Sequence, residues 1–106
     1  FSVRTVNLYK YLTREKKEYV LSKQLLRSAT SIGANVKEAK QGASRKDFIN
    51  KMNIALKEAS ESEYWIELLI ATNYLEKEFG KSILEDCEEI LKMLVSIVKT
   101  SKKYQV

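Results

Sequence analysis

Apolar residues recur along this chain at intervals of three and four, the spacing that gathers side chains on one face of an α-helix. The most regular stripe predicts a helix over residues 20–41. Its members are Leu21, Leu25, Ala29, Ile32, Val36 and Ala39. The same spacing predicts a first helix over residues 2–16 and a fourth over residues 82–103. The chain is therefore expected to be mostly helical.

The third predicted helix, residues 45–75, carries a heptad-like seam of apolar and small residues. The seam consists of Phe48, Met52, Ala55, Ala59, Ser62, Ile66 and Leu69. A helix of this length extends about 45 Å, which is long for a chain of 106 residues. We therefore expect an elongated molecule.

Short connections join the predicted helices. Gly42 is placed to end the second helix, and Ser44 followed by Asp47 resembles a capping box that begins the third. Gly80 is interpreted as the end of the next connection, and Ser82 as the first residue of another capping box. Because short links place neighbouring helices antiparallel, the sequence predicts an all-α fold. The expected architecture is a single domain, residues 1–106, that forms an up-down-up-down four-helix bundle.

The third predicted helix also has a second apolar flank, formed by Ile54, Trp65 and Leu68. This flank lies roughly 100–160° around the helix from Phe48, and Glu58 and Glu61 share it. A helix in a monomeric bundle usually needs one apolar stripe, so we interpret the flank as an oligomer interface. The alternative is a wide arc that is buried inside the same bundle.

Composition narrows the classes of function. The chain has no His and one Cys, which removes Ser-His and Cys-His catalysis, Cys₂His₂ zinc sites and internal disulfides. No stretch approaches the roughly 18 apolar residues of a membrane span. With no Pro and three Gly, a turn-rich β fold is disfavoured. These features predict a helical cytoplasmic protein without a metal or another cofactor.

The acidic residues are interpreted as partners in ion pairs. Aligning the second and third helices about their connection places Arg27 near Glu58, and Glu38 is expected to pair with Lys51 or Arg45. Acid–base or metal chemistry by the neighbouring carboxylates Glu58 and Glu61 is the less favoured interpretation. A glycosidase needs two opposed carboxylates in a cleft, and a di-metal bundle normally adds His ligands; neither is visible in this sequence. We therefore predict that the protein is not an enzyme.

A second group of residues is assigned to packing. Cys87 lies on the apolar stripe of the fourth helix, where a small core residue is more common than a nucleophile. Glu63 interrupts an apolar row and is expected to be partly buried. Ser28 and Ser31 lie in a polar run that is expected to hydrogen-bond between helices.

Basic residues are the remaining candidates for function, and they concentrate in the first half of the chain. Residues 1–53 hold 12 Lys and Arg against 4 Asp and Glu, whereas residues 54–106 hold 7 against 10. This asymmetry indicates either attraction between helices or subunits or a face that binds nucleic-acid phosphates. The candidate nucleic-acid-binding residues are Arg14, Lys17, Lys23, Arg27, Lys37, Lys40, Arg45 and Lys46. The alternative function is a protein–protein interaction adaptor that does not bind nucleic acid.

Two blocks of sequence resemble a known family. Residues 21–39, LSKQLLRSATSIGANVKEA, look like the signature of the bacterial 23S ribosomal RNA intervening-sequence (S23) proteins. Residues 44–49, SRKDFI, and 54–65, IALKEASESEYW, resemble the second conserved block of that family. Residues 1–12 and 97–102 fit its two ends. The resemblance covers nearly the whole chain.

The resemblance implies an antiparallel four-helix bundle that assembles as a homopentameric barrel. Members of the family are similar to the accessory variability protein of diversity-generating retroelements, a basic pentamer implicated in binding nucleic acid and a reverse transcriptase. The implied partners of this chain are therefore further copies of itself, RNA or DNA, and an enzyme that acts on nucleic acid. No membrane partner is implied.

Overall fold

The computed structural model describes residues 1–42 and 44–103 and contains four α-helices. They are α1 (Ser2–Arg14), α2 (Leu21–Lys40), α3 (Arg45–Ala71) and α4 (Lys77–Lys103). The described part of the chain has no β-strand, so the predicted all-α class is confirmed. No helix in this part is long and apolar enough to cross a membrane.

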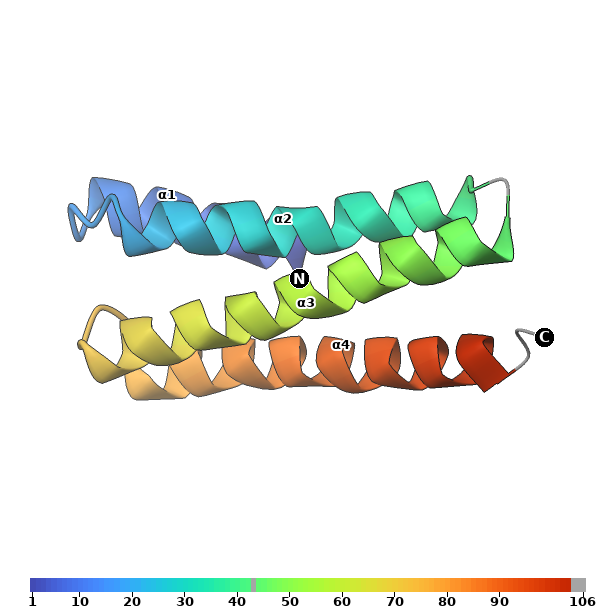
Figure 1. The fold of residues 1–106 in the computed structure, drawn as a ribbon. Coiled ribbons are helices and arrows are strands. Elements are labelled where there is room, and N and C mark those ends of the chain that lie inside the picture. The colour runs from blue at the N-terminus through green and yellow to red at the C-terminus, as the bar shows by residue number, and fades with distance from the viewer. Residues whose placement is uncertain (43, 104–106) are drawn as a thin grey trace.

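Successive helices run in opposite directions and lie along one another (Figure 1). α2 packs along α3, α3 packs along α4, and α1 packs against α2. The molecule measures 50 × 20 × 17 Å, which agrees with the elongated shape predicted from the long third helix. The α2–α3 connection and the end of α4 therefore lie at one end of the molecule, and the α1–α2 and α3–α4 connections lie at the other (Figure 1).

The core consists of two clusters of buried apolar side chains. The first joins all four helices and contains Leu8, Leu12, Leu25, Ala29, Ile66, Leu69, Leu75, Ile83 and Cys87. The second joins α2, α3 and α4 and contains Ile32, Ala39, Met52, Ala55, Ala59, Leu94 and Val98. The seam predicted along the third helix is confirmed, because every member is buried except Phe48, which is half-buried.

The helix ends differ from the predicted ones most clearly between α3 and α4. α3 ends at Ala71 instead of residue 75, because Asn73 adopts the left-handed conformation (φ 65°) that stops a helix. α4 begins at Lys77, so the capping box predicted at Ser82 is wrong. Gly80 lies inside α4 and is buried, and a Cβ at Gly80 would lie only 2.6 Å from Cγ1 of Ile70. Gly80 therefore permits close packing and does not interrupt the helix.

The other connections use caps that the sequence identified only in part. Ser44 caps α3 as predicted, because its hydroxyl accepts a hydrogen bond from the backbone N–H of Asp47. Gly42 follows the end of α2 without a left-handed φ, so it is not the C-cap glycine that we expected. α1 ends at Arg14 instead of residue 16, shortly before Lys17 takes a φ of 54°.

Candidate nucleic-acid interface

Four of the predicted binding residues come together at the α2–α3 connection. Lys37 and Lys40 lie in the last turn of α2, and Arg45 and Lys46 lie in the first turn of α3. The end of α4 reaches the same place, because Arg45, Phe48, Thr100 and Ser101 line an open hollow of about 510 Å³. Lys99, Lys102 and Lys103 lie on this end of α4. We call these seven cationic residues the basic end.

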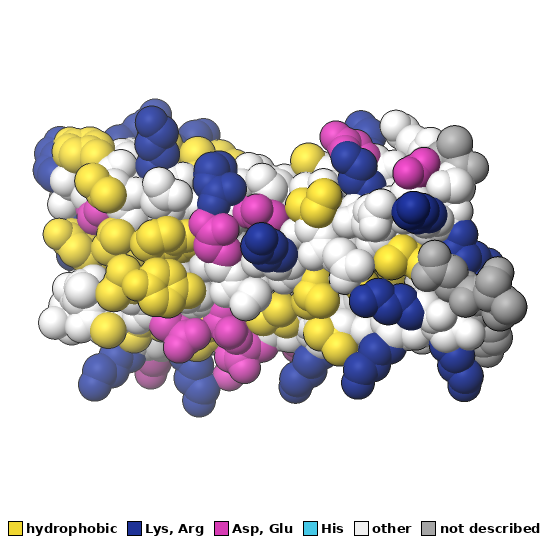
Figure 2. Space-filling model, viewed as in Figure 1, with side chains coloured by type: hydrophobic (Ala, Val, Ile, Leu, Met, Phe, Trp, Pro, Cys, Tyr) yellow, Lys and Arg dark blue, Asp and Glu magenta, His cyan; other side chains and the backbone are white. Residues whose placement is uncertain are grey.

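Two acidic residues, Glu38 and Asp47, lie at the basic end in the part of the chain that the structure describes. The Glu38 carboxylate is 2.9 Å from the ammonium of Lys51, which confirms one of the two expected pairings. Asp47 lies in the first turn of α3, where a carboxylate is attracted to the positive end of the helix dipole. The cationic members are solvent-exposed. In Figure 2, dark-blue side chains lie at this end and also along the rest of the molecule.

Three other predicted residues, Arg14, Lys17 and Lys23, lie at the opposite end of the molecule. Arg14 ends α1, and Lys17 and Lys23 flank the start of α2. The 14 residues from Lys23 to Lys37 extend about 21 Å along α2. The eight residues predicted from the sequence therefore do not form one patch.

Arg27 lies between the two ends and pairs with α3. Its guanidinium is 3.2 Å from the carboxylate of Glu58 and also contacts that of Glu61, so the predicted ion pair is present. Trp65 donates a hydrogen bond from Nε1 to the same Glu61 carboxylate at 3.1 Å. The Trp65 hydrogen bond and then Arg27 lower the pKa of Glu61. Arg27 therefore joins α2 to α3, and its charge already has two partners.

The apolar flank of α3, Ile54, Trp65 and Leu68, lies at the surface of this single chain. Ile54 is 43% exposed, and Trp65 and Leu68 are half-buried. The exposed ring of Tyr64 packs edge-on against Trp65, with 5.0 Å between the ring centroids. Figure 2 shows apolar side chains gathered on this face toward the end with the α3–α4 connection. The surface is available for an interface, and the interface itself stays a prediction.

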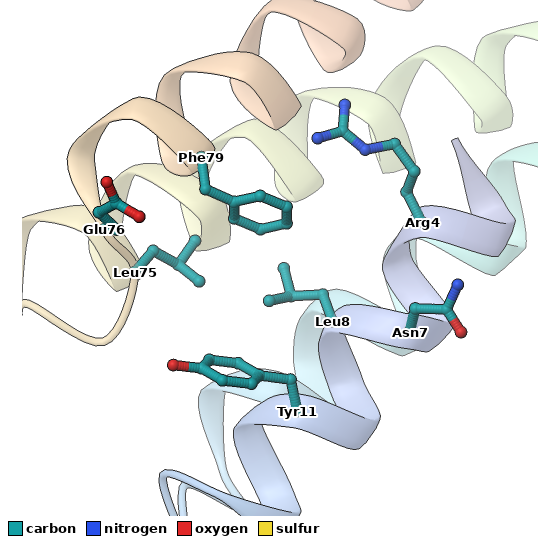
Figure 3. Close-up of a pocket in the computed structure, with 7 residues that line it drawn as sticks. All are labelled: Arg4, Asn7, Leu8, Tyr11, Leu75, Glu76 and Phe79. Atoms are coloured by element: carbon teal, nitrogen blue, oxygen red, sulfur yellow. The ribbon is translucent and has the colours of Figure 1, made fainter.

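A pocket between α1 and α4 was not predicted from the sequence. It has a volume of about 480 Å³, and it is lined by Arg4, Asn7, Leu8, Tyr11, Leu75, Glu76 and Phe79. Phe79 extends from α4 on one side and Tyr11 from α1 on the other (Figure 3). The sequence feature that indicates one wall of this pocket is the recurrence of Arg4, Leu8 and Tyr11 at intervals of four and three on the first helix.

The polar groups of Cys87, Ser28 and Ser62 have hydrogen-bond partners inside the core. Cys87 is buried as predicted, and burial raises the pKa of its thiol to about 12, above the range in which it would be a reactive thiolate. The hydroxyls of Ser28 and Ser62 hydrogen-bond to each other at 2.8 Å between α2 and α3, which confirms a polar contact between helices. In residues 1–42 and 44–103, no group of three or more metal-ligating side chains is arranged around one point.

The comparisons with known proteins agree on one family. The sequence model of the 23S rRNA-intervening sequence proteins matches residues 1–96 of this chain. A solved structure from Bacteroides thetaiotaomicron, described as a protein with unknown function from the S23 ribosomal protein family, is 64% identical. The match covers 93% of this chain and 92% of that one, with a TM-score of 0.92. No curated protein matches this chain.

Proposed function

The chain belongs to the 23S rRNA-intervening sequence protein family, and we propose that it is a non-enzymatic, homo-oligomeric module that binds the backbone of RNA or DNA. The observation that carries this proposal is the basic end, where cations from the end of α2, the start of α3 and the end of α4 lie together. Lysine and arginine clusters of this kind bind phosphates and release counterions.

The proposed recognition is of the backbone and not of base sequence. The basic end presents side chains from helix ends, and within residues 1–42 and 44–103 no helix or strand projects from it as a reading element for a groove. Thr100 and Ser101 line the hollow beside Arg45 and offer hydroxyl donors to a phosphate oxygen. Contacts of this type position a nucleic acid without selecting its sequence.

We further propose that several copies present their basic ends together. The apolar flank gives a surface for such contacts, and the resemblance of residues 21–39 to the family signature implies five copies. Linking several weak phosphate sites raises the overall affinity because later contacts become intramolecular. A nucleic-acid enzyme could then be held beside the bound strand, in the cytoplasm.

A direct test is a salt-titrated binding assay with fluorescent single-stranded RNA, single-stranded DNA and duplex DNA. The proposal expects affinity to fall at least 10-fold between about 50 and 200 mM salt. The fourfold variant Lys37→Glu, Lys40→Glu, Arg45→Glu, Lys46→Glu is expected to lose binding at every salt concentration, because it reverses the charge of the phosphate contacts.

A control variant shows whether binding depends on where the positive charges lie or only on the net charge of the protein. Reversing Lys57, Lys77, Lys81 and Lys92 changes the net charge equally, and all four residues are exposed outside the basic end. Duplex binding should survive this change to a larger extent than it survives reversal of the basic end. Equal losses in the two variants would contradict the assigned site. A defined oligomer that binds none of the three probes at 50 mM salt would instead favour the protein–protein adaptor.

A further inference from the structure

The pocket between α1 and α4 has the form of a slot with aromatic sides. Tyr11 is 44% exposed and Phe79 is 38% exposed, so both rings are accessible to a ligand. Leu8 and Leu75 lie between the two rings in Figure 3 and are themselves buried, which makes them the apolar floor of the slot. Two accessible rings over an aliphatic floor suit a flat, largely apolar group.

We propose that this slot receives one unpaired base of a single-stranded nucleic acid, stacked against Tyr11 and Phe79. The inference rests on the proposed nucleic-acid function and adds a second contact to it, at the opposite end of the molecule from the basic end. Every nucleobase has a π-face, so aromatic side chains bind single strands with little regard to sequence.

Arg4 holds one wall of the slot in place. Its guanidinium lies 5.3 Å from the centroid of the Phe79 ring, within the range of a cation–π contact. The same guanidinium pairs with the Asp86 carboxylate and donates a hydrogen bond to the Ser82 hydroxyl at 3.3 Å. Because Arg4 already has these partners, it orients Phe79, and the phosphate contacts fall to other residues.

Cations for the adjoining phosphates are supplied by α1. Arg14 follows Tyr11 by three residues, and Lys10 follows Asn7, another residue of the slot, by three residues. Each is therefore one turn further along the helix from a residue that lines the slot. Both are solvent-exposed. The two exposed cations suit the phosphates on either side of a stacked base, so the α1 side of the slot favours a nucleotide over an uncharged aromatic group.

The polar residues at the opening suit the edge of a base. Asn7 and Glu76 line the pocket, and both are exposed, so their amide and carboxylate can turn toward a bound group. An amide offers both a donor and an acceptor, and a carboxylate accepts from the amino groups of bases. The Glu76 carboxylate also repels phosphate, which directs the strand backbone toward α1.

The test compares three probes: a 12-nucleotide oligo(dT), a 12-unit abasic phosphodiester strand with the same number of phosphates, and a 12-base-pair duplex, which carries about twice as many phosphates. The inference expects the wild-type protein to bind oligo(dT) about 10-fold or more tightly than the abasic strand. Tyr11→Leu and Phe79→Leu keep an apolar side chain but remove a ring. Each should reduce oligo(dT) affinity to that of the abasic strand and leave duplex affinity unchanged.

Tyr19→Leu is the matched control, because Tyr19 is an exposed tyrosine outside the slot and its loss should not change oligo(dT) affinity. Tyr11→Phe should retain binding, since it retains the ring. Equal wild-type affinity for oligo(dT) and the abasic strand would overturn the slot while leaving the proposed function intact. Failure of all three probes to bind would overturn the proposed function and the slot with it. Ring variants that weaken all three probes equally would also contradict base stacking.

Discussion

Glu18 connects α1 to α2 through hydrogen bonds to the backbone. Its carboxylate accepts from the N–H groups of Val20 at 3.1 Å, Leu21 at 2.8 Å and Ser22 at 2.7 Å. These donors at the start of α2 have no partner within the helix itself. Burial alone would raise the pKa of Glu18, but the hydrogen bonds outweigh it and the pKa is lowered from its ordinary value of 4.5. Glu18 therefore stabilises the fold more as a carboxylate than in its protonated form.

Replacing Glu18 by Gln is expected to reduce the free energy of unfolding at pH 7 by about 1–2 kcal/mol, because charge-assisted capping is lost. The folded pKa is below the unfolded one, so this contribution is present above about pH 4.5 and is lost as the pH falls through the folded value. Urea unfolding at a series of pH values measures it. The variant should lose less stability on acidification than the wild type, and equal acid sensitivity would contradict the assignment.

Glu63 provides a control of opposite sign. Burial, and then the neighbouring carboxylates of Glu67 and Glu88, raise its pKa above 4.5. Its charge therefore opposes folding as the pH rises through the folded pKa. Glu63→Gln should accordingly leave stability at pH 7 unchanged or slightly increased in the same urea measurements.

At the scale of the helices, the sequence predicts buried faces better than helix ends. The seam of α3 was predictable because burial of apolar residues at helical spacing is the main source of helix stability in a bundle. The ends depend on local backbone conformation and on tertiary contacts. Asn73 was available as a stop signal, whereas the role of Gly80 depends on Ile70, a residue on another helix. Sequence alone does not contain that contact.

The same difference explains which part of the candidate site was predictable. Lys40 and Arg45 are close in the sequence on either side of one connection, so topology alone placed the basic end. Tyr11 and Phe79 are on α1 and α4, and their meeting depends on the three-dimensional packing of the bundle. Because the fourth helix was predicted to begin at residue 82, Phe79 was assigned to a connection and the aromatic slot was missed.

The glycines inside α2 and α4 give a paired prediction. At Gly33 a Cβ would meet only the hydroxyl oxygen of Ser2 at 3.5 Å, an ordinary contact. Gly33→Ala should therefore increase the free energy of unfolding by about 1 kcal/mol through helix propensity. At Gly80 a new Cβ would overlap with the side chain of Ile70, and this steric cost outweighs the gain in helix propensity. Gly80→Ala should therefore reduce the free energy of unfolding by about 1–3 kcal/mol.

Denaturant unfolding of the two variants under identical conditions measures the difference. In an Ile70→Ala background, Gly80→Ala should cost less stability than it does in the wild type, because that background lacks the atoms that the new Cβ would meet. A stabilising Gly80→Ala substitution would contradict the close approach of α3 and α4 at this point.

At the scale of the whole molecule, the apolar flank on α3 is the proposed contact between copies, and the resemblance of residues 21–39 to the family signature implies five copies. We expect the wild-type protein to have about five times the 12.3 kDa mass of one chain at micromolar concentration. Ile54→Glu with Leu68→Glu should lower that mass, because each buries an unpaired charge in the interface. Size-exclusion chromatography with light scattering is the measurement.

Val3→Glu with Val20→Glu is the matched control, since both residues are highly exposed outside the flank. The control should keep the wild-type mass. A wild-type mass of a single chain, or equal dissociation of the two double variants, would contradict an interface at the flank.

The rate at which the Cys87 thiol reacts can be used to measure how often the helix bundle opens. The chain has a single cysteine, and its sulfur is buried between helices, where it donates a hydrogen bond to the backbone oxygen of Ala59 on α3 at 3.4 Å. A disulfide-exchange dye can reach this atom only after α4 separates from α3. The rate of labelling in native buffer therefore reports how often the two longest helices come apart, without any introduced probe.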